Sequence, residues 1–264
     1  MKPLNYQKVI MRFKLTLTVD KRAFGNLLPL NYQYELSSFV YRTIERANAT
    51  YSKWLHENGF ELATKQFRLF NFSHFQIPAY KIEGNRLRID SDTITWFVSF
   101  LPEQSTEEFI KGVFAEQVFT IGDKLSKVQL RVANIELLPE PDFSKQDQFN
   151  TLSPVCITRH IPGQNRIAYE SPDSNYAREA LLYNPKNKYN VFYGKEFSGD
   201  GRFDFKLLSP PKSKLIVIKA NTPEQTQVKG FTFRFTLQAH PDLMHMLYHG
   251  GLGEKNSTGF GMVE

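Results

Sequence analysis

The chain contains very little cysteine and no long apolar run. Cys156 is the single cysteine among 264 residues, which excludes an internal disulfide and a structural zinc site built from two to four thiolates. No stretch approaches the 18 apolar residues of a membrane-spanning helix, and the first twenty residues lack the apolar core of a signal peptide. These absences predict a cytoplasmic protein that has no membrane partner.

The chain also has few tryptophans, and fewer acidic than basic residues. The chain has 2 Trp against 23 Phe and 12 Tyr, an aromatic content that suits a β-rich core or the stacking of nucleic-acid bases. Asp and Glu number 27 against 33 Lys and Arg, so the formal net charge is +6. This surplus favours a polyanionic partner, although a basic surface that serves solubility accounts for it equally well.

Two successive halves of the chain show a similar order of predicted elements. Alternation with period two and helical periodicity predict, in the first half, a strand over 11–19, helices over 36–47 and 51–58, strands over 67–73, 79–82 and 86–89, a helix over 103–114 and a strand over 127–138. The second half is predicted to contain a strand over 153–160, a helix over 175–193, strands over 214–219 and 230–238, a helix over 241–249 and a final strand near 260–264. Pro185 should break or kink the helix in which it lies.

Each half has the order β-α-β-β-α-β, which is typical of the ferredoxin-like fold. The sequence therefore predicts an α+β protein with two such domains in tandem, over residues 1–138 and 151–264. The polar, proline-bearing residues 139–150 are predicted to form the linker.

A glycine-rich segment, GGLGEKNSTGFG at 250–261, precedes the last predicted strand and holds five of the fifteen glycines. It contains no Gly-Lys-Ser/Thr triplet and lacks the spacing of a dinucleotide-binding loop. This segment, together with two ferredoxin-like halves, resembles the RAMP superfamily of CRISPR-associated proteins. The closest resemblance within it is to the endoribonucleases that process CRISPR repeat transcripts.

The resemblance extends over nearly the whole chain. It includes the stretches MRFKLTLTVD, LPLNYQYELSSFVYRTI, WLHENGF, LFNFS, the LSP of residues 152–154 and GLGEKNSTGFGMV, of which the last is the most specific. Members of the family usually begin at a residue equivalent to Met11, so residues 1–10 are an extension in this chain.

The resemblance implies a metal-independent reaction that needs no cofactor, with Tyr41 and His56 as catalytic residues. The 2′-hydroxyl of the RNA attacks the adjacent phosphate and leaves a 2′,3′-cyclic phosphate and a 5′-hydroxyl end. Helix phase agrees with this assignment, because Tyr41 lies roughly 100° around its helix from the centre of the apolar face. His56 points away from the buried side that Trp54 and Leu55 are expected to form. Two ordinary surface residues, or a Tyr–His hydrogen bond, would show the same pattern.

A cationic residue usually completes such a site, and the family places it just before the strand LFNFS. Arg68 is the positional match and Lys65 is the alternative. We expect His56 to act as general acid or base, Tyr41 as the partner base or a positioning donor, and Arg68 to stabilise the charge on the phosphate.

The residues expected to bind RNA lie mainly in the glycine-rich segment, whose backbone N–H groups can turn toward a phosphate. They are Gly250, Gly251, Gly253, Lys255, Asn256, Ser257, Gly259 and Gly261, together with Arg159 near the expected domain interface.

His245 and His249 stand four residues apart on a predicted helix, a spacing that can bind metal. No acidic residue or cysteine clusters with them in the sequence, so no metal site is predicted.

The leading hypothesis is an endoribonuclease that cuts CRISPR precursor RNA within its repeats. A non-catalytic RAMP subunit that binds repeat RNA is the alternative. Transfer of the product to a CRISPR effector complex and formation of a homodimer both stay open.

Overall fold

The computed structural model describes residues 11–144, 147–161, 163, 167–220 and 222–264. The expected extension at residues 1–10 lies outside this part. None of the helices in the described ranges is both long and apolar enough to cross a membrane.

The first half is built on a five-stranded antiparallel sheet in the order β5-β8-β1-β10-β9. Phe13, Leu15 and Leu17 alternate along its central strand and are buried, as period-two patterning requires. The strands are β1 (Met11–Asp20), β5 (Phe70–Phe72), β8 (Thr93–Phe100), β9 (Val118–Gly122) and β10 (Lys127–Leu138).

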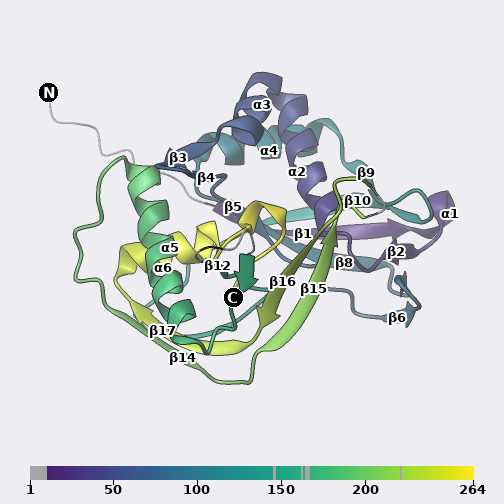
Figure 1. The fold of residues 1–264 in the computed structure, drawn as a ribbon. Coiled ribbons are helices and arrows are strands. Elements are labelled where there is room, and N and C mark those ends of the chain that lie inside the picture. The colour runs from purple at the N-terminus through teal and green to yellow at the C-terminus, as the bar shows by residue number, and fades with distance from the viewer. Residues whose placement is uncertain (1–10, 145–146, 162, 164–166, 221) are drawn as a thin grey trace, which may run out of the picture.

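Three helices cover one face of this sheet (Figure 1), namely α2 (Gln33–Ala47), α3 (Ala49–Glu57) and α4 (Glu103–Ala115). The apolar residues of α2 recur at three- and four-residue steps, and Leu36, Phe39 and Ile44 are fully buried or nearly so. α4 packs on α2 at Gly112, where a Cβ atom would collide with the backbone oxygen of Thr43. Sheet and helices thus enclose one core, and α2 also contacts residues 256–258 of the second half.

Smaller elements surround this core. They are α1 (Lys21–Phe24), the sheet of β2 (Leu27–Pro29), β6 (Tyr80–Glu83) and β7 (Arg86–Ile89), and the hairpin of β3 (Phe60–Leu62) and β4 (Lys65–Phe67).

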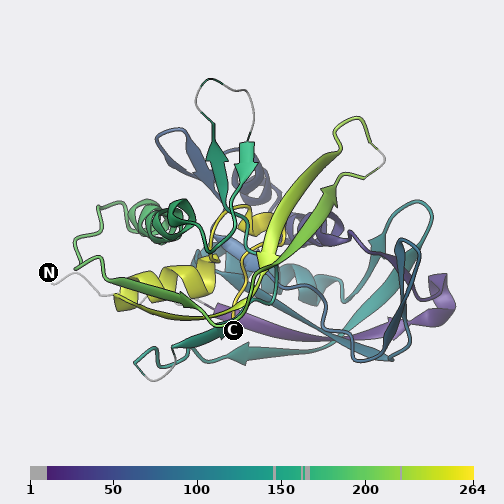
Figure 2. The ribbon, with the colours of Figure 1, turned by 60° about the horizontal axis from the view of Figure 1, so that its bottom comes forward.

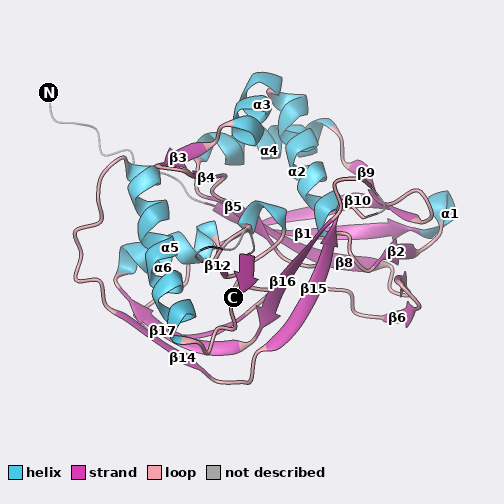
Figure 3. Ribbon diagram, viewed as in Figure 1, coloured by secondary structure: helices cyan, strands magenta, loops and turns pink. Residues whose placement is uncertain are grey.

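The second half has a sheet in the order β11-β17-β14, against which two helices pack (Figure 3). An antiparallel bridge between Thr151 and Val263 places the end of the chain beside β11, so the strand order repeats that of the first half. The elements are β11 (Gln148–Asn150), β14 (Phe203–Leu207), β17 (Arg234–Ala239), α5 (Asn175–Tyr193) and α6 (Pro241–Gly250). Both halves therefore have the predicted ferredoxin-like order.

Two hairpins project from the second half on the same side of the molecule (Figure 2). One pairs β12 (Thr158–His160) with β13 (Ile167–Tyr169), and the other pairs β15 (Lys212–Ile218) with β16 (Thr226–Thr232).

Several predicted boundaries in the second half are wrong. The single strand expected over 230–238 is two strands, β16 and β17, which belong to different sheets. Phe231, Phe233, Phe235 and Leu237 are all buried, so the alternation continues across the change of sheet and conceals it. α5 runs through Pro185 without the expected break.

Three further differences concern short segments. The last three residues of the expected linker form β11, only residues 158–160 of the strand expected over 153–160 are strand, and the expected final strand is reduced to the bridge at Val263. On α3, Trp54 is 38% exposed rather than buried, because its ring lies on the surface against Tyr51 and Phe60.

Arg12 joins the two halves through a buried contact. Its guanidinium, 1% exposed, donates to the backbone oxygens of Val263, at 2.6 Å, and Tyr248, and lies 3.6 Å from the centre of the Tyr248 ring. Burial lowers the pKa of Arg12 to about 10, so the side chain remains charged at neutral pH. The central strand of the first half is thereby attached to α6 and to the C-terminal residues.

α6 also contacts the sheet of the first half through His249, the residue that follows Tyr248. Asn71 on β5 donates to the backbone oxygen of His249 at 3.0 Å, and the Ser99 hydroxyl on β8 lies 3.1 Å from His249 Nδ1. Burial lowers the pKa of His249 to about 4, so its imidazole is neutral at physiological pH. α6 is thus fixed against the first half immediately before the glycine-rich segment begins.

Candidate active site

Tyr41 in the middle of α2, His56 in the last turn of α3 and Arg68 directly after β4 come together. The rings of Tyr41 and His56 meet edge to face, with centroids 4.9 Å apart, and the side chains of Arg68 and Ser257 lie close enough to the Tyr41 hydroxyl to affect its pKa. His56 is exposed, whereas Tyr41 is half-buried and packs against Phe70. The two residues predicted to be catalytic are therefore neighbours on the surface side of the core.

Arg68 is held in place by the C-terminal end of α3. Its guanidinium donates to the backbone oxygens of His56, at 2.6 Å, and Asn58, at 2.9 Å. Gly59 makes this approach possible, because it has a φ of +62° and a Cβ atom there would lie 2.6 Å from Arg68 Nη1. Arg68 thus connects β4 to the helix end that carries His56, and it places a permanent cation beside the two rings.

Burial raises the pKa of Tyr41 above its ordinary value, and the nearby charge of Arg68 and polar side chain of Ser257 only partly oppose this shift. A phenol with a raised pKa stays protonated at neutral pH. Tyr41 is therefore suited to donate a hydrogen bond rather than to act as a general base.

A cleft of about 340 Å³ opens beside this cluster, between β4 and the glycine-rich segment. Its lining contains cationic and polar groups from both halves of the chain, including Lys65, Arg68, His160, Lys255, Asn256 and Ser257. Basic side chains that converge on one cleft provide a path for a phosphate backbone.

The glycine-rich segment crosses from α6 to the C-terminus between the two halves, with a short helical turn η1 (Asn256–Thr258) that packs on α2 and β5. Ser37 on α2 donates to the backbone oxygen of Ser257 at 2.7 Å. The five glycines of the segment are buried, and their lack of side chains allows close packing. The residues of the segment that line the cleft are Glu254, Lys255, Asn256 and Ser257, and contact of this segment with RNA stays a prediction.

The buried side chain of Lys188 on α5 binds the glycine-rich segment. The side chain is 2% exposed, and its ammonium donates to the backbone oxygens of Gly250, at 3.0 Å, and Gly251, and to Asn256 Oδ1 at 2.8 Å. Gly253 O lies 3.3 Å from the same nitrogen. Burial lowers the pKa of Lys188 to about 7. The buried lysine thus donates to several backbone oxygens of the glycine-rich segment, whose one regular element among the described residues after α6 is the short turn η1.

Sequence analysis did not identify this role of Lys188. A signal was present, because Lys188 follows Leu181 by seven residues and so lies on the apolar stripe of α5 with Ala177, Leu181 and Phe192. A lysine on a buried stripe needs acceptors for its charge, but the pattern does not say which segment supplies them.

The remaining predicted residues take other positions. Lys65 is exposed, and its ammonium lies 3.9 Å from Glu254 Oε1 at the edge of the cleft. Arg159 is not among the described residues that line the cleft, and its Nε pairs with Glu170 Oε1 at 2.6 Å. Arg68 is therefore the cation next to Tyr41, and Lys65 lies further along the same cleft.

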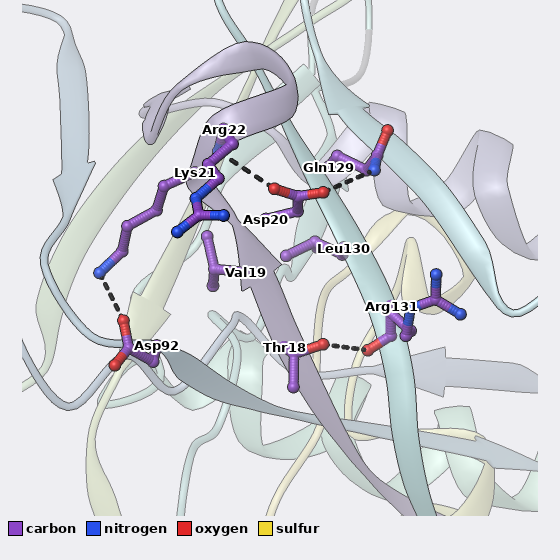
Figure 4. A pocket seen from close by; sticks show the side chains of 9 residues that line it. All are labelled: Thr18, Val19, Asp20, Lys21, Arg22, Asp92, Gln129, Leu130 and Arg131. Atoms are coloured by element: carbon purple, nitrogen blue, oxygen red, sulfur yellow. Dashed lines mark hydrogen bonds and ion pairs between the residues drawn. The ribbon is translucent and has the colours of Figure 1, made fainter.

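A second hollow, of about 460 Å³, lies at the far end of the first half, where β1 meets α1 and β10 (Figure 4). Lys21 Nζ lies 2.7 Å from Asp92 Oδ1 there, and Asp20 accepts a hydrogen bond from the uncharged side chain of Gln129. It contains neither histidine nor tyrosine, so it lacks groups suited to proton transfer near neutral pH.

Gly253→Val and Gly259→Val should both destabilise the protein or weaken its binding of RNA. Both glycines have positive φ, +72° and +88°, and a Cβ atom would lie 2.5 Å from Cys156 O at the first and 2.8 Å from a Phe72 ring carbon at the second. Left-handed backbone costs a β-branched residue about 1–3 kcal/mol, and overpacking adds about 1–3 kcal/mol. Thermal melting and electrophoretic binding of repeat RNA measure both effects.

Gly84→Val is the matched control for these variants, because Gly84 has a φ of +60° but no atom within 4 Å of its Cβ position. It should show the cost of backbone strain alone. Wild-type melting temperature and RNA affinity in both Gly253→Val and Gly259→Val would contradict the role assigned to the segment.

Comparison with known families gives matches in both halves of the chain. Residues 27–135 match the model described as "CRISPR-associated protein Cas6, N-terminal", and residues 138–264 match "CRISPR associated protein Cas6, C-terminal". The two models meet close to the end of β10.

Individual relatives match over nearly the full length. The "CRISPR-associated endoribonuclease Cas6 1" of Methanocaldococcus jannaschii is 28% identical over 261 residues, which cover 96% of this chain and 92% of that protein. A solved structure named "CRISPR associated protein Cas6" is 27% identical, with a TM-score of 0.74 and coverage of 97% of this chain and 99% of the other. Another, described as "An RAMP protein binding different RNA substrates", has a TM-score of 0.79 at 22% identity and covers 96% and 98% of the two chains. At that identity the last match supports the fold alone.

Proposed function

Because the chain belongs to the Cas6 family of CRISPR-associated proteins, we propose that it is an endoribonuclease that binds and cleaves CRISPR precursor RNA within its repeats. The observation that carries the proposal is the meeting of Tyr41, His56 and Arg68 beside a basic cleft. These groups supply proton transfer and charge stabilisation, which are the requirements of RNA cleavage by an internal nucleophile.

In the proposed reaction the 2′-hydroxyl of one nucleotide attacks its own 3′-phosphate, and the 5′-oxygen of the next nucleotide leaves. The products end in a 2′,3′-cyclic phosphate and a 5′-hydroxyl. His56 either removes the proton from the attacking 2′-hydroxyl or supplies one to the leaving 5′-oxygen, because its exposed imidazole can reach the RNA and an imidazole can act as a general acid or base. Tyr41 donates a hydrogen bond to the phosphate, and the Arg68 guanidinium stabilises the additional negative charge.

Incubation of the protein with a repeat RNA in excess EDTA tests this mechanism. We expect cleavage to continue at an unchanged rate, because every group in the proposed reaction belongs to the protein or to the RNA. The products should resist 3′-end ligation until the cyclic phosphate is removed, and their 5′ ends should accept phosphate from a kinase. A requirement for Mg²⁺ would contradict the mechanism.

A repeat RNA with one 2′-deoxynucleotide on the 5′ side of the cleaved phosphate is the matched control substrate. It should bind as tightly as the all-RNA substrate and remain intact, because it lacks the nucleophile. Tight binding without any cleavage of the unmodified RNA would instead favour the alternative, a RAMP subunit that binds repeat RNA without cutting it. Delivery of the product to an effector complex and formation of a homodimer stay predictions, which size-exclusion chromatography with and without RNA can test.

A further inference from the structure

Glu140, His245 and His249 form a cluster of potential metal ligands that lies outside the proposed active site. The two histidines lie one turn apart on α6, with ring centroids 4.9 Å apart, and Glu140 comes from the segment that follows β10. One ligand atom from each residue lies within 4.8 Å of the other two. The sequence pattern predicts the histidine pair without an acidic partner, because Glu140 is 105 residues away from His245 along the chain.

His249 supplies an independent sign that a ligand belongs in this cluster. Its side chain is 2% exposed, and Nε2 has no hydrogen-bond partner among the described residues. Buried polar atoms are almost always bonded to something. The nearest carboxylate oxygen, Glu140 Oε1, is 3.6 Å from Nε2, which is too far for a hydrogen bond. The unpartnered nitrogen faces the space between Glu140 and His245.

The other ring nitrogen of His249 is already engaged. Nδ1 lies 3.1 Å from the Ser99 hydroxyl, so a proton on Nδ1 places the free lone pair on Nε2. Histidines that bind metals commonly donate their second ring nitrogen to a neighbouring group in this way, which fixes the tautomer and the orientation of the ring.

Glu140 and His245 complete the set. Glu140 Oε1 lies 2.5 Å from His245 Nδ1, a contact in which a proton bridges the two groups. A metal ion would replace that proton and draw the third ligand, His249 Nε2, into the same site. Arg12 is a cation near this cluster, but its guanidinium donates to the backbone oxygens of Val263 and Tyr248 and lies over the Tyr248 ring.

We propose that Glu140, His245 and His249 bind a divalent transition-metal ion of the zinc class. Two imidazole nitrogens and one carboxylate oxygen are ligands that Zn²⁺ accepts at about 2.0–2.2 Å, with water in the fourth tetrahedral position. Ca²⁺ and Mg²⁺ are disfavoured because they prefer all-oxygen sites. The ion would connect the segment after β10 to α6, which in turn contacts the sheet of the first half. Its role would be to keep the two halves in a fixed relative position.

This site is separate from the proposed chemistry. None of the three ligands lines the cleft beside Tyr41 and His56, as far as the described residues show. Removal of the ion should therefore lower the melting temperature without abolishing cleavage at temperatures where the protein stays folded. The metal proposal and the cleavage proposal consequently fail independently of each other.

Titration of tag-free, EDTA-treated and dialysed protein with ZnCl₂ in a calorimeter tests the proposal. We expect one ion per chain, a rise in melting temperature when Zn²⁺ is added, and a tetrahedral Co²⁺ absorption spectrum when CoCl₂ replaces it. His245→Ala and Glu140→Gln should each weaken Zn²⁺ binding at least tenfold, the loss typical when a metal site is damaged.

Both substitutions lie at partly exposed side chains, so these variants should fold even if the buried His249→Ala variant does not. Glu136→Gln is the matched control, because Glu136 is an exposed carboxylate on the same strand end that pairs only with Lys14 among the described residues. It should bind Zn²⁺ like the wild type. Absence of Zn²⁺ binding by the wild type, or unchanged affinity in both His245→Ala and Glu140→Gln, would overturn the proposal.

Discussion

His56→Ala should slow the cleavage of repeat RNA by roughly 10²–10⁴-fold, the usual contribution of one general acid or base. Its affinity for the same RNA should stay close to that of the wild type. The imidazole is exposed at the end of α3, and Arg68 bonds to the backbone oxygen of His56 rather than to its ring. Removal of the ring therefore deletes the proton-transfer group and leaves the position of Arg68 intact. Single-turnover cleavage and electrophoretic binding measure the two quantities separately.

Glu57→Ala is the matched control for this variant, because Glu57 is the next residue of α3 and is also exposed. It should cleave at the wild-type rate. A His56→Ala protein that cleaves as fast as Glu57→Ala would remove His56 from the mechanism. A variant that loses RNA binding together with cleavage would assign His56 to recognition rather than to chemistry.

Lys188→Met should lower the stability of the protein, because Lys188 is the shared donor to several backbone oxygens of the glycine-rich segment. Methionine fills a similar volume but donates no hydrogen bond, so the oxygens of Gly250, Gly251 and Asn256 lose their shared donor. Leaving buried acceptors without a partner costs about 1–3 kcal/mol. At roughly 2–4 °C per kcal/mol for a domain of 150–250 residues, we expect a melting temperature lowered by about 2–12 °C.

The same substitution should also release the glycine-rich segment from its position beside Tyr41. Ser257 of that segment lies beside Tyr41, so cleavage should slow even below the melting temperature. Amide hydrogen exchange over 250–261 should become faster. Lys186→Met, two residues earlier on α5 and partly exposed, should change neither quantity appreciably. An unaltered melting temperature and exchange pattern in Lys188→Met would show that the segment holds its shape without the ammonium group.

Much of the architecture follows from local pattern. The alternation in Met11–Asp20 and the three- and four-residue spacing of Leu36, Phe39 and Ile44 predict a strand and a helix that the structure contains, because each pattern must place its apolar residues on one face. The order of such elements predicts the ferredoxin-like repeat. Local pattern also places Tyr41 and His56 away from the fully buried faces of their helices.

Other features depend on contacts between distant parts of the chain. The change of sheet at Phe233 is hidden because burial continues through it, and the buried position of Lys188 acquires a purpose only when the oxygens of residues 250–256 fold over it. Periodicity reports which face of an element is buried, but it carries no information about the partner on that face.

By itself, therefore, the sequence determined the main helices of this protein, the ferredoxin-like order of its two halves and the position of Tyr41 and His56 away from the fully buried core. Tertiary structure alone brought Ser257 to Tyr41, 216 residues earlier in the chain, and Glu140 to His245. The physical reason is that hydrophobic periodicity acts within one helix or strand, whereas a site is assembled when the packing of several elements brings their polar ends to one place.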